Sequence, residues 1–308
     1  MALMFLSPDD PPEGWRAALL AEIPELDFRI WPEVGDPAEI DVALVWQPPP
    51  GELARYPNLR AILSLGAGID GLLAQAGLPA VPIARMVDPS LTRTMTEYVL
   101  LAALRHHRHF DRFERVQRAG RWSFALPPQA ADRRVGVMGL GVLGSAAAAS
   151  LAAHGFLVAG WSREAKQLAG VDSFAGRASL TAFLARTDIL VCLLPLTRDT
   201  AGILSAATFA GLPRGAFVIN VARGAHLAEA DLIEALDSGQ LAGATLDVFR
   251  EEPLPPENRL WRHPKVLITP HVASYASPLT AAEGVAENIR RARTGRPLLH
   301  QVDRDRGY

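Results

Sequence analysis

The sequence predicts an α/β fold in which two domains each contain an open, doubly wound parallel sheet. Short apolar runs that suit buried strands alternate with helical stretches along most of the chain. Near the middle, a glycine-rich turn from Gly139 to Gly144 joins one such strand to a small, alanine-rich helix. The length of 308 residues is sufficient for two domains that share a cleft.

The first 88 residues alternate between strand and helix signals, which predicts a small, open α/β sheet. A helix is expected over Glu13–Ile23, and three prolines at 48–50 end the strand before them. Glycines at 66, 68 and 71 indicate a tight turn into a second helix. The expected strands are Leu3–Leu6, Phe28–Trp31, Asp41–Trp46, Ala61–Leu65 and Val81–Met86.

A long helix is expected over Leu91–Arg118, because a Pro-Ser pair precedes it and a glycine follows it. Its C-terminal half carries His106, His107 and His109. A metal site is one interpretation of these histidines. A solvated helix face or a subunit contact is favoured, because no compact ligand set with carboxylates converges there, and no metal is expected.

The segment Arg121–Arg134, after this helix, contains prolines and has no regular pattern. This segment could wrap around a partner subunit. The helix and this segment are too long, and in places too apolar, to form an arm that stands alone in solvent. A homodimer is therefore expected.

From Val135 onward the strand and helix pattern becomes regular. The final helix, Leu279–Arg293, is expected to cross back to the first domain. Two domains are therefore predicted. Residues 1–96 and 277–308 form a discontinuous, flavodoxin-like substrate domain. Residues 97–276 form an NADP-binding domain of the Rossmann type. The strands expected in the second domain are Val135–Met138, Leu157–Trp161, Ile189–Leu194, Phe217–Asn220, Ala244–Val248 and Val266–Thr269.

Composition narrows the range of functions. A net charge of -2 gives no reason to expect a nucleic acid or an acidic membrane surface as a partner. No apolar run approaches the length of a membrane span, and Met1–Ser7 resembles a first strand more than a signal peptide. Cys192 is the only cysteine and lies in an apolar run, so a buried strand thiol in a cytoplasmic protein is expected.

The sequence Gly139-x-Gly141-x-x-Gly144 lies between a strand and a helix, as a dinucleotide site of the Rossmann type requires. The first glycine permits the tight turn, the second lets the backbone approach a pyrophosphate, and the third lets helix and strand pack together. The helix N-terminus at Val142 and Leu143 offers unpaired N–H groups to the anion. The alternative is a glycine-rich turn without a ligand.

The tip of the next strand, Trp161-Ser162-Arg163, predicts that the cofactor is NADPH, with NADH bound more weakly. An NAD site needs an acid here for the ribose 2′-hydroxyl, and none is present. Ser162 can donate a hydrogen bond, and Arg163, with Lys166 nearby, can pair with a 2′-phosphate. The alternative is that Arg163 only reflects a chain in which all but two of the basic residues are arginine.

Further polar residues stand at the ends of later strands, where open α/β sheets bind ligands. A guanidinium at Arg223 can clamp a carboxylate, and Asp247 could accept a bond from the nicotinamide carboxamide. Glu252 and His271 complete a coherent reduction site, although each alone could be structural. The other cofactor contacts expected at these strand ends are Leu194, Pro195, Val221, Ala222 and Ala273.

Several of these motifs together resemble the D-2-hydroxyacid dehydrogenases, over essentially the whole chain. They are Gly66–Asp70, the glycine-rich turn, Val221–Gly224, Asp247–Phe249 with Glu252–Pro255, and Thr269–His271. Within that family the chain is most similar to the NADPH-linked glyoxylate/hydroxypyruvate reductases. This narrower similarity rests on Leu44–Pro49, Trp161–Arg163 and Gln301–Arg304.

The resemblance implies reduction of glyoxylate- or hydroxypyruvate-type 2-keto acids to D-2-hydroxy acids. Arg223 would hold the substrate carboxylate, and His271 would protonate the developing alkoxide while Glu252 orients it. Substrate contacts are also implied for Trp46 and for the backbone N–H groups of Ala67 and Gly68. Two alternatives stay open: a dehydrogenase for a bulkier 2-keto acid, and a dinucleotide-sensing binding protein on the same fold.

Overall fold

The computed structural model describes residues 1–307, which form two compact α/β units. One unit contains Met1–Leu91 together with the chain from Tyr275 onward, and the other is Thr92–Ser274. The domain boundaries expected from the sequence, near 97 and 276, lie a few residues away. Because both ends of the chain belong to the first unit, that unit is discontinuous in sequence.

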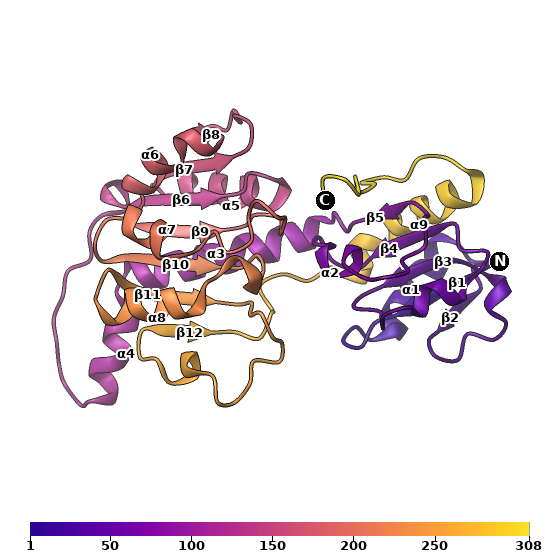
Figure 1. The fold of residues 1–308 in the computed structure, drawn as a ribbon, viewed down its shortest axis with the longest axis horizontal. Coiled ribbons are helices and arrows are strands. Elements are labelled where there is room, and N and C mark those ends of the chain that lie inside the picture. The colour runs from indigo at the N-terminus through magenta and orange to yellow at the C-terminus, as the bar shows by residue number, and fades with distance from the viewer. Residues whose placement is uncertain (308) are drawn as a thin grey trace. The chain divides into compact units, whose positions relative to one another are not determined.

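The smaller unit is a five-stranded parallel sheet in the order β2-β1-β3-β4-β5 (Figure 1). This is the order of flavodoxin-like folds, in which the chain changes direction across the sheet between the first and third strands. Every residue of β1 and β3 is buried, which explains their nearly continuous apolar sequences. The strands are β1 (Ala2–Leu6), β2 (Phe28–Ile30), β3 (Ile40–Val45), β4 (Ala61–Ser64) and β5 (Ile83–Ala84), and the helices are α1 (Pro12–Glu22), α2 (Asp70–Leu73) and α9 (Pro278–Thr294).

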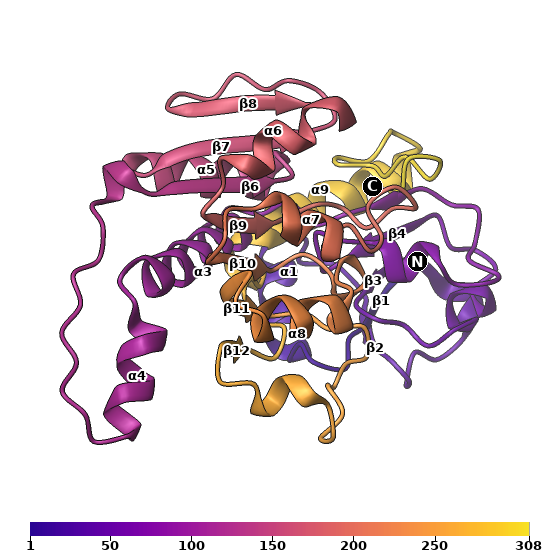
Figure 2. The same cartoon turned by 60° about the vertical axis from the view of Figure 1, so that its left-hand side comes forward.

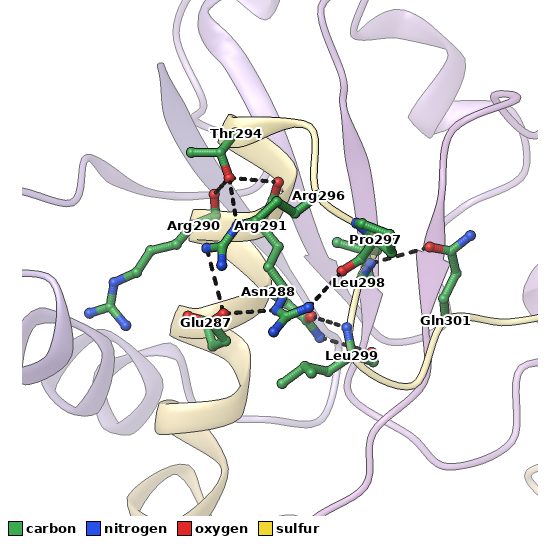
Figure 3. A network of polar contacts seen from close by, with 10 residues as sticks. All are labelled: Glu287, Asn288, Arg290, Arg291, Thr294, Arg296, Pro297, Leu298, Leu299 and Gln301. Carbon is green, nitrogen blue, oxygen red and sulfur yellow. Dashed lines mark hydrogen bonds and ion pairs between the residues drawn. The ribbon is translucent and has the colours of Figure 1, made fainter.

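The last helix, α9, joins the C-terminal part of the chain to this sheet. It packs against α1, and its Arg293 donates to both carboxylate oxygens of the buried Asp41 on β3, at 2.8 and 3.0 Å. Figure 3 shows how the segment after the helix folds back: Asn288 exchanges hydrogen bonds with the backbone of Leu299 at 2.7 and 3.2 Å, and Arg291 donates to the carbonyl of Pro297. These bonds satisfy backbone groups of the segment that follows the helix.

The larger unit is a seven-stranded parallel sheet in the order β12-β11-β10-β9-β6-β7-β8 (Figures 1 and 2). Alternate residues along β9 enter different cores, since Ile189 and Val191 pack with α3 and α5 while Leu190 and Cys192 pack with α6, α7 and α8. Helices therefore cover both faces, as in a doubly wound sheet. The strands are β6 (Arg134–Met138), β7 (Leu157–Ser162), β8 (Val171–Ala175), β9 (Ile189–Cys192), β10 (Ala216–Asn220), β11 (Leu241–Leu246) and β12 (Val266–Ile268). The helices are α3 (Pro89–His107), which begins in the smaller unit, α4 (Phe110–Arg118), α5 (Val142–Ala153), α6 (Leu180–Ala185), α7 (Ala206–Gly211) and α8 (Glu229–Asp237).

The single helix expected over Leu91–Arg118 is wrong, because the structure contains two helices, α3 and α4. His109 lies between them with a φ of 59°, a left-handed conformation that cannot continue an α-helix. The expected strand at Val81–Met86 is reduced to Ile83–Ala84, and β8 was not predicted, because its exposed, mixed sequence lacks an apolar pattern.

The expectation that the three histidines occupy a solvated helix face is wrong for His106 and His107, which are both buried. The ring of His106 stacks on Phe217, and its Nε2 lies 2.9 Å from the hydroxyl of Thr245. Burial lowers the pKa of His106 to about 4, so this imidazole is neutral at physiological pH. Both histidines therefore belong to the core of the larger unit.

The segment expected to be irregular, Arg121–Arg134, contains one short 3₁₀ turn, at Ala130–Asp132, before β6 begins at its last residue. With α4 it extends away from the sheet in both views (Figures 1 and 2). Among residues 1–307, no helix is both long and apolar enough to span a membrane.

Candidate active site

The strand order of the larger unit reverses between β6 and β9, which places a crevice at the carboxyl ends of these two strands. The chain leaves β6 through Gly139, which has a φ of +98°. A Cβ at this position would lie 2.6 Å from the carbonyl oxygen of Leu193, on the segment that follows β9. Only glycine permits this approach, so the two segments that border the crevice are in backbone contact.

The turn then leads into α5, whose N-terminus can accept a pyrophosphate. A Cβ on Gly144 would lie 1.8 Å from the carbonyl oxygen of Gly139, so helix and turn pack as the sequence predicted. Gly141 caps the helix without a side chain, and a Cβ at this position would have no other group within 4 Å. The amides of Val142 and Leu143 belong to the first turn, which has no acceptors inside the helix. These groups fit a dinucleotide phosphate.

The tip of β7 carries the residues predicted to distinguish the two nicotinamide cofactors. The indole of Trp161 is buried and donates to the carbonyl of Gly176 at 2.9 Å. Arg163 and Lys166 lie exposed on the loop between β7 and β8. The hydroxyl of Ser162 donates to the carbonyl of Glu164 at 2.6 Å, so it must rotate before it can donate to a phosphate. The cationic side chains fit a 2′-phosphate without this change.

Two loops that follow β9 and β10 are joined by a histidine that the sequence did not single out. His226 is fully buried, and its ring nitrogens lie 3.2 Å from the carbonyl oxygen of Arg223 and 3.3 Å from that of Pro195. The buried amide of Asn220 donates to the same Arg223 carbonyl and accepts from the N–H of Ala222. The backbone that carries Arg223 is therefore fixed from two sides.

Glu252 and His271 form a direct pair. The Nδ1 atom of His271 lies 2.7 Å from Oε2 of Glu252, whose Oε1 accepts the backbone N–H of Phe249, also at 2.7 Å. Burial alone would raise the pKa of Glu252, but the bonds from His271 and Phe249, with the nearby charge of Arg223, hold this pKa below its usual value. Glu252 is thus an ionised acceptor that orients the imidazole.

His271 has a φ of 54°, a left-handed conformation that is uncommon for a residue other than glycine. Its backbone N–H donates to the carbonyl oxygens of Asp247 at 2.8 Å and Thr269 at 3.1 Å. The carboxylate of Asp247 accepts the next two amides, from Val272 and Ala273, both at 2.9 Å. These bonds hold the turn in a conformation that it would not adopt alone.

The carboxylate of Asp247 fixes the turn after β12. Its side chain is buried, and its oxygens accept the Thr269 hydroxyl and the amides of Val272 and Ala273. The nicotinamide contact expected for this carboxylate stays a prediction. Ala273 itself is buried in the core around α3 and α5.

Trp46, Ala67 and Gly68 belong to the smaller unit, at the ends of β3 and β4. Trp46 is half-buried, and the turn after β4 is closed by Ser64, whose hydroxyl accepts the N–H of Gly66. Within residues 1–307, the amides of Ala67 and Gly68 donate to no protein acceptor. The turn therefore offers two N–H donors, and their contact with a substrate carboxylate stays a prediction.

Other reactive groups serve the fold. Cys192 is buried on β9, and burial raises the pKa of its thiol to about 12, so it is not a nucleophile. In the part of the chain that the structure describes, no group of three or more His, Cys, Asp and Glu side chains is arranged for a metal. The sequence gives no signal for His226, because its contact with the carbonyl of Pro195 joins residues 31 positions apart.

Comparison with known proteins places the chain in a family. A family model for the NAD-binding domain of D-isomer specific 2-hydroxyacid dehydrogenases matches residues 100–273. The chain is 44% identical over 314 aligned positions to glyoxylate/hydroxypyruvate reductase A of Serratia proteamaculans, with 100% of both proteins covered. Two solved structures have the same fold. The D-isomer specific 2-hydroxyacid dehydrogenase of Xanthobacter autotrophicus, in complex with NADPH and MES, has a TM-score of 0.95 and 52% identity over 100% of this chain and 99% of that one.

The second is the NADPH-dependent glyoxylate/hydroxypyruvate reductase of Sinorhizobium meliloti, in complex with NADP and sulfate. It has a TM-score of 0.93 and 42% identity, and both chains are covered completely. Both solved structures therefore resemble this chain over its full length in sequence and in fold. The chain therefore belongs to the D-isomer specific 2-hydroxyacid dehydrogenases.

Proposed function

We propose that this protein is an NADPH-dependent reductase of small 2-keto acids of the glyoxylate and hydroxypyruvate type. The observation that carries the proposal is the 2.7 Å bond between His271 and Glu252, beside a dinucleotide-type crevice. The names of its relatives from Serratia and Sinorhizobium support the same substrates, and the complexes of its structural relatives with NADPH and NADP support the cofactor.

In the proposed reduction, the cofactor and the three strand-end side chains have separate roles. Bound NADPH supplies a hydride to the carbonyl carbon of the keto acid. Arg223 binds the substrate carboxylate and polarises the carbonyl group. Because Nδ1 of His271 is engaged by Glu252, Nε2 is the atom that protonates the carbonyl oxygen as negative charge develops there. The imidazole then regains a proton from solvent, while Glu252 keeps it in the same orientation.

We assign substrate contacts also to Trp46 and to the amides of Ala67 and Gly68, which are two donors suited to a carboxylate. The phosphate of NADPH is assigned to Arg163 and Lys166, and its pyrophosphate to the N-terminus of α5. The cytoplasm is the proposed location, because the one cysteine is a buried thiol and the fold has no need of an oxidising compartment.

We further propose a homodimer that associates through α4 and residues 119–129. Trp122 is 101% exposed, and Phe124 and Leu126 are each 78% exposed, which is unusual for three large apolar side chains so close in sequence.

His271→Ala should lower kcat for glyoxylate and hydroxypyruvate by about 10²- to 10⁴-fold, because it removes the general acid. Binding of NADPH, measured by fluorescence titration, should persist. His263→Ala is the matched control, since His263 pairs with Asp237 outside the crevice and should leave turnover unchanged. Near-normal turnover by His271→Ala would reject the proposed role of His271. A panel that adds bulkier keto acids identifies the preferred substrate, and no turnover with any of them would favour a dinucleotide-sensing protein.

Glu252→Gln should reduce thermal stability in a pH-dependent manner. The folded state lowers the pKa of Glu252, so its ionised form stabilises the fold above the ordinary value of 4.5, and this stabilisation is lost as the pH falls through the lower folded value. The difference in Tm between wild type and variant should be largest near neutral pH and should shrink under acid conditions. Glu251→Gln, at an exposed neighbour, is the control. A difference that stays constant with pH would contradict the assignment.

Arg163→Ala should raise KM for NADPH by about ten- to a hundredfold, the effect of one lost charge-assisted contact. KM for NADH should barely change, because NADH lacks the 2′-phosphate. Arg259→Ala removes an exposed arginine near the opposite edge of the sheet and should alter neither constant. Equal rises for both cofactors would show that Arg163 supports the fold, and a wild-type preference for NADH would refute the cofactor assignment.

Light scattering at micromolar concentration should give the mass of two chains for the wild-type protein. Trp122→Ser should shift the mass toward one chain, because it removes the most exposed apolar side chain of the segment. Trp261→Ser alters a tryptophan that is 48% exposed elsewhere in the same unit and should leave the dimer intact. A wild-type monomer would eliminate this proposal.

A further inference from the structure

A row of three side chains connects α3 to the turn that carries His271. The hydroxyl of Tyr98, on α3, lies 2.5 Å from Oγ1 of Thr269, although the two residues are 171 positions apart in sequence. The hydroxyl of Thr269 in turn lies 2.6 Å from Oδ1 of Asp247, at the end of β11. None of these three side chains needs to touch the substrate to influence the reaction.

The chemistry of Asp247 determines the direction of both bonds. Its two carboxylate oxygens accept backbone N–H groups, so it acts as an ionised acceptor with no proton to donate. The single hydroxyl hydrogen of Thr269 therefore points to Asp247. The oxygen of Thr269 must then accept, and Tyr98 must donate. Burial raises the pKa of Tyr98 to about 12, so the phenol keeps this hydrogen at any working pH.

The same carboxylate holds the left-handed turn. Asp247 accepts the amides of Val272 and Ala273 through its side chain and the amide of His271 through its carbonyl oxygen. A histidine at a φ of 54° is in a sparsely populated conformation and persists only where its surroundings over-determine it. Any freedom gained by Thr269 or Asp247 therefore reaches the backbone of His271.

We propose that Tyr98 is a positioning residue for the reduction: its hydroxyl orders Thr269, which orders Asp247 and thereby the imidazole of His271. This inference rests on the proposed role of His271 as general acid. Tyr98 is not a catalytic residue, since it acts only through the turn. Its effect should appear in kcat, because the turn sets the angle from which Nε2 approaches the carbonyl oxygen.

The test is Tyr98→Phe, which removes one oxygen and keeps the ring in place. We expect kcat to fall by about tenfold, while KM for the keto acid and the dissociation constant of NADPH stay within about twofold. Thr269→Val should behave similarly. The double variant Tyr98→Phe with Thr269→Val should be no slower than Thr269→Val alone, because the two residues act in series.

Tyr56→Phe is the matched control for simple loss of a buried tyrosine hydroxyl. Tyr56 donates to Glu52 at 2.7 Å in the smaller unit, so its loss should lower Tm without lowering kcat. Unchanged kcat in Tyr98→Phe, or a loss fully additive with Thr269→Val, would overturn the proposal.

A second cycle separates this proposal from the proposed function. In a His271→Ala background, Tyr98→Phe should cause no further loss, because the group that it positions is absent. An equal loss in that background would show that Tyr98 acts by another route and overturns the inference while the role of His271 stands. If His271→Ala alone keeps wild-type turnover, the role of His271 fails, and the positioning role of Tyr98 fails with it.

Discussion

The buried carboxylate of Asp247 is the constraint on which the geometry of the candidate site depends. It stands where β11 ends, and it accepts hydrogen bonds from Thr269, Val272 and Ala273, all at or just beyond the end of β12. A buried charge is tolerated only when donors surround it, so the chain after β12 must curl around this residue. The left-handed conformation of His271 is the consequence of that curl. An apolar residue at 247 would leave two amides and a hydroxyl without acceptors.

The charges around His271 determine what this turn can do chemically. Glu252 is held ionised by the bonds from His271 and Phe249, in spite of partial burial. An ionised partner at Nδ1 orients the imidazole, so that Nε2 is the ring atom directed to other groups. Arg223 adds a positive charge close enough to influence Glu252, and it is suited to a substrate carboxylate.

The helical region before β6 shows how a cluster of one residue type can mislead. His106, His107 and His109 are close in sequence, yet the chain turns sharply at His109 and sends the first two into the core. There they serve as flat, neutral side chains, one stacked on Phe217 and the other edge-on to Phe156. The homodimer proposed above rests on the exposed apolar residues beyond α4.

The sequence by itself determined the architecture and the pairing of chemical groups with strand ends. Apolar runs of strand length and a glycine-rich turn suffice for two doubly wound sheets, because buried parallel strands and a dinucleotide turn leave strong local patterns. The same patterns placed Arg223, Glu252 and His271 at successive strand ends. The bond between Glu252 and His271 could only be expected from a family resemblance, since nineteen positions separate them.

Only the tertiary structure decided which polar residues act through others. Tyr98 and Thr269 have no local pattern that connects them, because their contact requires α3 to pack beside the end of β12. The bonds from the amides of Val272 and Ala273 to Asp247 are equally a result of packing, because no local pattern predicts them. The break at His109 was equally hidden, since no glycine or proline marks a helix end between residues 91 and 118. Hydrogen bonds between residues far apart in sequence depend on how helices and strands pack, and no short stretch of the sequence determines that packing.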